Sequence, residues 1–179
     1  MKTPPLLPAE TLHRVLRVAN LDGLSVLLVA GLLALVSAAS GDYLGTVLGL
    51  LVAAAGAIEL HGAGLLGAGD RRGVSWLLFS QPFLLAILLG VCAWQLTHFD
   101  PVAMAQLKSL LQASSGNVWK TQAAQAGFSE TEYLTLLRRT VYWGVALVTL
   151  LYQGGMTLYY LRRRDALLAA VAEPFEEIA

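Results

Sequence analysis

The sequence predicts an all-α integral membrane protein, a bundle of four transmembrane helices. Three observations favour this class. Four separate stretches reach the ~20 mostly apolar residues that a helix needs to cross a bilayer. Hydrophobic residues make up 56% of the chain and charged residues only 13%, against roughly 25% in a typical soluble domain. The ionisable side chains lie almost entirely outside the four stretches.

The expected spans cover residues 21–40, 43–66, 76–96 and 141–161. Span one contains Asp22, span two contains Glu59 and His61, and the other two contain no acidic, basic or histidine residue. Gly41 and Asp42 predict a tight hairpin between the first two spans, and a short Gly-rich turn joins the second to the third. We therefore expect a single membrane domain over residues 1–179.

An amphipathic helix is expected before the first span. Leu12, Val15, Leu16 and Ala19 recur at the spacing of one helix face, and basic residues occupy the other face. A basic amphipathic helix next to a span typically lies in the plane of the membrane interface. We therefore predict an N-terminal interfacial helix over residues 8–20.

Residues 97–140 should form a small helical domain outside the membrane, on the side away from the cytoplasm. One helix begins at Pro101, and a second begins at Ser129, where Ser129 and Glu132 form a capping-box pattern. The second helix is expected to run directly into span four. The aromatic residues around these helices and at the span ends predict headgroup or interface positions, for Trp119, Phe128, Tyr133, Tyr142, Trp143, Tyr159 and Tyr160.

The distribution of lysine and arginine predicts the orientation. Eight of the twelve basic residues fall on the side of the termini and of the turn between spans two and three, and four fall in the long loop. The side richer in lysine and arginine is the cytoplasmic one. Both termini are therefore expected in the cytoplasm, and the short loops favour a bacterial inner membrane. The pair Arg138 and Arg139 runs against this trend.

Polar residues of all four spans fall at a similar depth, in the cytoplasmic half of the bilayer. An ionisable group at such a depth is costly and is a functional candidate by default. Two interpretations remain open: a structural cluster of interhelical hydrogen bonds, or a path for ions, protons or a small ligand. The candidate residues are Glu59, Gln81, Gln153, Ser80, Asp22 and His61.

Helical phase separates two of these candidates. Glu59 shares a face with small residues, whereas His61 lies about 200° around the helix, at about 100° per residue. A metal site built from both side chains of one helix is therefore not expected. Small-residue faces also predict close helix packing or assembly of several chains, through Gly45, Gly49, Gly56, Gly144, Gly154 and Gly155.

These features favour a small oligomeric channel, transporter or ligand-binding membrane protein. The alternatives are a scaffold or accessory subunit that binds a partner membrane protein, and an intramembrane enzyme that uses Glu59 as an acid or base. The enzyme is disfavoured because no second catalytic group accompanies Glu59. No motif predicts a metal, a haem or another cofactor, and a net charge of zero gives no reason to expect nucleic acid.

Overall fold

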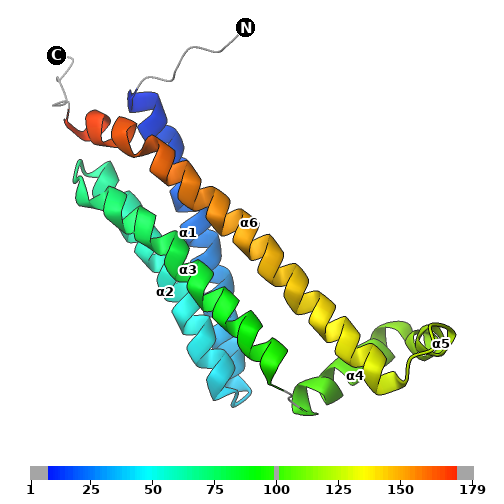
Figure 1. Ribbon diagram of the computed structural model, residues 1–179. Coiled ribbons are helices and arrows are strands. Elements are labelled where there is room, and N and C mark those ends of the chain that lie inside the picture. Colours follow the sequence, from blue (N-terminus) through cyan, green and yellow to red (C-terminus); the bar gives the residue numbers. More distant parts are fainter. Residues whose placement is uncertain (1–7, 99–100, 173–179) are drawn as a thin grey trace, which may run out of the picture. The chain divides into compact units, whose positions relative to one another are not determined.

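The protein is built from α-helices. The computed structural model describes residues 8–98 and 101–172, and at residues 102–103 it describes the backbone alone. No strand occurs in these ranges, which confirms the all-α class. The helices are α1 (Pro8–Ala39), α2 (Tyr43–Gly67), α3 (Arg72–Thr97), α4 (Pro101–Ser115), α5 (Val118–Gln125) and α6 (Glu130–Ala172) (Figure 1).

Four of these helices, α1, α2, α3 and α6, are long and apolar enough to cross a membrane. They contain the four predicted spans, except that α1 ends one residue before the predicted end of span one. The contacts divide the chain into two units. Unit 1 consists of α1, α2, α3 up to residue 88 and α6 from residue 149, and unit 2 consists of residues 89–148.

The first helix differs from the prediction. α1 continues without a break from Pro8 to Ala39, so the segment expected to be a separate interfacial helix is the beginning of the span-one helix. The predicted apolar stripe is present, but it packs against other helices of the protein. Val15 and Ala19 are fully buried, in the same cluster as Tyr160 and Leu167 of α6.

Glycines allow α1 and α2 to pack at very short range. The predicted hairpin is present, with Gly41 at φ +74°, where a side chain would be strained. Further along, a Cβ added to Gly56 would lie 2.7 Å from the carbonyl oxygen of Gly23 and 2.7 Å from the backbone nitrogen of Leu27. A Cβ on Gly49 would lie 2.8 Å from the Cβ of Ala34. The backbones therefore meet where only glycine fits.

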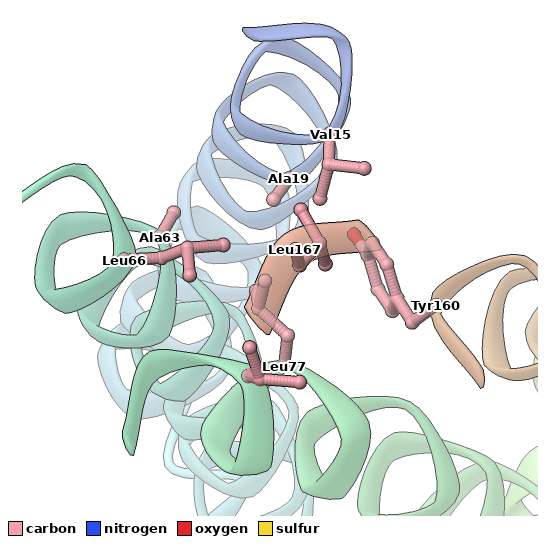
Figure 2. Close-up of a cluster of buried hydrophobic side chains, with 8 residues drawn as sticks. Val15, Ala19, Ala63, Leu66, Leu77, Tyr160 and Leu167 are labelled. Atoms are coloured by element: carbon pink, nitrogen blue, oxygen red, sulfur yellow. The ribbon is translucent and has the colours of Figure 1, made fainter. Parts of the chain in front are cut away.

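Close backbone packing at glycines also joins α2 to α3. A Cβ on Gly73 would lie 2.5 Å from the carbonyl oxygen of Gly62, and a Cβ on Gly62 would lie 2.9 Å from the Cβ of Trp76. Apolar side chains of all four long helices then fill the space between them (Figure 2). The buried members of this cluster are Val15, Ala19, Ala63, Leu66, Val74, Leu77, Tyr160 and Leu167.

Unit 2 has a small core of its own, made by Met104, Trp119 and Leu134. The helix α5 that supplies Trp119 was not predicted. Trp119 was expected near the headgroups, but its side chain is only 2% exposed because it packs between the helices of this unit. Arg138 donates hydrogen bonds to the carbonyls of Gln95 and His98 at the end of α3, where a helix leaves carbonyls unpaired.

The predicted capping box begins α6. The backbone N–H of Ser129 donates to a carboxylate oxygen of Glu132 at 2.9 Å, and the N–H of Glu132 donates to the Ser129 hydroxyl at 3.3 Å. The hydrogen bond from the Ser129 side chain holds the pKa of Glu132 below its ordinary value. The Lys108 ammonium similarly lowers the pKa of Glu130, to which it donates at 3.0 Å.

The glycine crossing gives a direct prediction about stability. Gly56→Ala should destabilise the protein by about 1–3 kcal/mol, because the new methyl group meets backbone atoms that cannot move aside alone. The matched control is Gly64→Ala, in the same helix, where no atom lies within 4 Å of an added Cβ. Thermal unfolding in mild detergent measures both. Equal melting temperatures for the two variants would contradict the close crossing.

Candidate functional site

Most of the polar residues predicted at one depth are buried inside unit 1. The exposed fractions are 9% for Asp22, 1% for Glu59, 1% for Ser80, 0% for Gln81 and 4% for Gln153. They come from α1, α2, α3 and α6, so each long helix contributes at least one. We call Asp22, Glu59, Gln81 and Gln153, together with Tyr152 and Tyr160 described below, the polar cluster.

Asp22 joins three helices through its carboxylate. One oxygen, Oδ1, accepts a hydrogen bond from the hydroxyl of Tyr152 in α6 at 2.8 Å. The other oxygen, Oδ2, accepts from Nε2 of Gln81 in α3 at 3.4 Å. Both carboxylate oxygens of Asp22 are thus engaged, and α1 is linked to α3 and to α6.

Glu59 makes the corresponding link from α2. Its Oε1 accepts a hydrogen bond from the hydroxyl of Tyr160 at 2.6 Å, a short distance typical of hydrogen bonds to a carboxyl group. Asp22 and Gln81 lie beside the same carboxyl group. Gly23 explains this proximity, because its missing side chain lets the Cβ of Glu59 approach to within 3.3 Å of the place where a Cβ would stand.

Two buried oxygens of the cluster have no hydrogen-bond partner. They are the side-chain carbonyl oxygens of Gln81 and Gln153. A buried acceptor without a donor costs roughly 1–3 kcal/mol. Such oxygens are suited to receive a hydrogen bond or to coordinate a cation.

Among the described residues, no basic side chain forms an ion pair with either carboxyl group. In the part of the chain that the structure describes, the ion pairs are those of Glu130 with Lys108 and Lys120, in unit 2. A buried carboxylate without a counter-charge is so costly that it takes up a proton or pairs with a cation. Each carboxyl group of the polar cluster is therefore expected to hold a proton or to pair with a cation.

The donor set limits which cation is suitable. No group of three or more His, Cys, Asp or Glu side chains comes together among the described residues. The cluster offers carboxylate, amide and phenol oxygens, which suit protons and hard cations, whereas Zn²⁺ and Cu²⁺ favour nitrogen and sulfur ligands.

Two predicted residues are placed apart from this network. Ser80 is buried, but its hydroxyl donates to the carbonyl of Leu77 in its own helix at 3.0 Å. His61 is exposed and sets its ring edge-on against Trp76, with 5.4 Å between the ring centroids. The buried Glu59 and the exposed His61 thus differ as helical phase predicted.

The two tyrosines were not predicted as members of the cluster. Tyr160 was assigned to the aromatic belt, but it is 1% exposed and donates to Glu59. The spacing offered a signal, because Gln153 and Tyr160 lie seven residues apart and share a helix face. Pro82 was also overlooked. It lacks an N–H, so the Leu78 carbonyl receives no helical hydrogen bond beside Gln81.

The glycines predicted for packing fall into two groups. Within the chain, Gly45, Gly49 and Gly56 meet close neighbours. Nothing lies within 4 Å of a Cβ added to Gly144, Gly154 or Gly155. Their role in assembling several copies stays a prediction.

Comparisons with known proteins found no match to this chain, whether among protein-family models, curated proteins or solved structures.

The short hydrogen bond between Tyr160 and Glu59 should contribute to stability. Tyr160→Phe should cost about 1–3 kcal/mol, because it leaves a buried carboxyl group without its donor. Tyr152→Phe should cost less, since Tyr152 is 52% exposed and Asp22 keeps the hydrogen bond from Gln81. Tyr142→Phe, in the same helix but outside the cluster, serves as the control. Denaturant titration in detergent micelles gives the order of the three variants, and a Tyr160→Phe variant as stable as the control would refute the assignment.

Proposed function

We propose that this chain is an oligomeric multi-pass membrane protein that carries a small cation, protons included, through the polar cluster. The observation that supports this function is the pair of neighbouring carboxyl groups, Asp22 and Glu59, buried without a basic partner among the described residues. A purely structural cluster could make the same interhelical hydrogen bonds with neutral amides or hydroxyls. A cation path needs groups that exchange a positive charge within an apolar bundle.

Residues around the pair favour this proposal over a simple interhelical contact. The unpartnered carbonyl oxygens of Gln81 and Gln153 add acceptors to the carboxylates. The hydroxyls of Tyr152 and Tyr160 can each donate to a carboxylate or accept from a hydrated cation. The cluster thus provides several exchangeable oxygen ligands.

Oligomerisation follows from the small number of helices. Four helices rarely enclose a pore, so a continuous path needs the faces of several copies. α6 offers a face for this contact, with open glycines at Gly144 and Gly155 and exposed apolar side chains, namely Leu147, Val148, Leu151 and Leu158. We place this assembly in a bacterial inner membrane, with both termini in the cytoplasm.

Exchange of charge at the cluster can be tested in reconstituted vesicles. Glu59→Gln and Asp22→Asn should each abolish flux, because an amide has the shape of a carboxyl group but cannot exchange a positive charge. An internal pH dye reports proton movement, and imposed Na⁺ or K⁺ gradients distinguish protons from metal cations. Asp42→Asn is the matched control, since it makes the same chemical change at the exposed N-terminus of α2, where Asn also caps well.

Undiminished flux in both cluster variants would reject the proposal. An absence of flux in the wild type, together with a stoichiometric membrane partner in mild detergent, would favour the accessory subunit instead. A specific observation supports that second candidate. Unit 2 has its own core of Met104, Trp119 and Leu134. This core gives the unit a structured surface, which a cation path does not require.

The proposed orientation has a separate test. In a Cys92→Ser background, Ser115→Cys places a thiol in α4 and Ala68→Cys places one in the turn after α2, both at exposed positions. A membrane-impermeant maleimide should label the α4 thiol in spheroplasts, which lack the outer membrane, and the other thiol only after their inner membrane is permeabilised. The opposite pattern would reverse the orientation.

A further inference from the structure

The part of α6 that follows the polar cluster holds two polar groups whose burial the cation path does not explain. The hydroxyl of Tyr159 and Nη1 of Arg163 are both buried, and neither has a hydrogen-bond partner. Arg163 is half-buried, whereas its neighbours Arg162 and Arg164 are exposed. One arginine of the three is therefore drawn into the protein.

The position of Arg163 in the helix explains its burial. It lies three residues after Tyr160 and four before Leu167, so it shares their helix face. Both of those residues are 1% exposed and belong to the main apolar cluster, in which Figure 2 shows them facing Val15 and Ala19 of α1. The arginine is consequently held against the bundle.

An aromatic ring fixes the guanidinium. Cζ of Arg163 lies 4.0 Å from the ring centroid of Tyr159, a cation–π contact. The Tyr159 ring in turn meets the Tyr160 ring at 5.5 Å between centroids, with an interplanar angle of 68°. The Tyr159 hydroxyl and the Arg163 guanidinium are therefore neighbours, and both can donate hydrogen bonds.

Neither the Tyr159 hydroxyl nor Nη1 of Arg163 has an acceptor within the described chain, where the ion pairs involve Glu130 alone among the acids. A buried guanidinium N–H without an acceptor is more costly than a neutral one. A phosphate group meets this need best, because it has several acceptor oxygens for a planar guanidinium and carries the opposite charge. Arg162 and Arg164 add positive charge at the surface beside it.

We propose that Arg163 and the Tyr159 hydroxyl bind the phosphate group of an anionic ligand at the end of the apolar part of α6. The site lies where the helix is expected to leave the membrane, so the phosphate belongs either to a lipid headgroup or to a phosphate in solution. This site is separate from the cation path and does not depend on it.

The test compares matched arginine substitutions in the full-length protein in nanodiscs. Native mass spectrometry counts retained phosphatidylglycerol in mixtures with phosphatidylcholine. Arg163→Gln should weaken retention about tenfold, the effect of losing one charge-assisted hydrogen bond. Arg164→Gln removes the same charge from an exposed position and should have little effect. Tyr159→Phe should reduce retention by a smaller factor.

Inorganic phosphate, titrated calorimetrically into detergent-purified protein, identifies the source. Binding that Arg163→Gln removes indicates a soluble phosphate, whereas phosphatidylglycerol retention alone indicates a lipid headgroup. If Arg163→Gln does not fold, Arg163→Lys and Tyr159→Phe apply the same test, and Arg163→Lys should bind less because an ammonium lacks the planar donor pair. Equal retention in all variants, with no phosphate binding to the wild type, would overturn the proposal.

Discussion

The close approach of α1 and α2 at Gly23 and Gly56 is the constraint on which the rest of unit 1 depends. An added Cβ at either position meets the backbone of the other helix. At this short separation Glu59 lies directly beside Asp22, although two buried carboxyl groups would repel each other if both were ionised. The polar cluster is thus a consequence of backbone geometry. α3 and α6 then supply the donors that make two neighbouring acids tolerable, through Gln81, Tyr152 and Tyr160.

The distribution of polar groups in unit 1 separates two kinds of contact. Apolar side chains and glycines account for most of the packing of α1, α2 and α3, which one hydrogen bond from Gln81 to Asp22 supplements. α6 adds two hydrogen bonds to the bundle, and both end on carboxyl groups. Its outer face carries exposed leucines and valines and open glycines, which suit lipid or a second copy of the chain. α6 therefore contacts the buried acids on one face and exposes apolar side chains on the other.

Much of this arrangement could be predicted from the sequence, because the signals are local. Apolar length located the four long helices, the Gly41–Asp42 pair located the hairpin, and Ser129 with Glu132 located the start of α6. Depth grouped Asp22, Glu59, Gln81 and Gln153, and helical phase predicted that Glu59 faces protein; all four are buried.

The misses all required a partner that local patterns do not reveal. Tyr160 looks like a belt residue until α2 supplies Glu59, and Trp119 looks interfacial until α4 and α6 supply its pocket. The stripe around Val15 correctly predicted an apolar surface. It did not predict that this surface packs in one cluster with Leu167, a residue far away in the sequence. The helix α5 is only eight residues long, and its sequence is too polar to show an apolar stripe.

The hydrogen bonds of the two tyrosines have a consequence for the motion of α6. Under the proposed function, a cation at Oε1 of Glu59 or Oδ1 of Asp22 would compete with the tyrosine hydroxyl that this oxygen now accepts. Binding of the cation and attachment of α6 would then be linked, and such linkage is reciprocal. A bound cation would weaken the attachment of α6, and a firmly attached α6 would lower the affinity for the cation. Movement of this one helix would in this way follow the occupancy of the carboxyl pair.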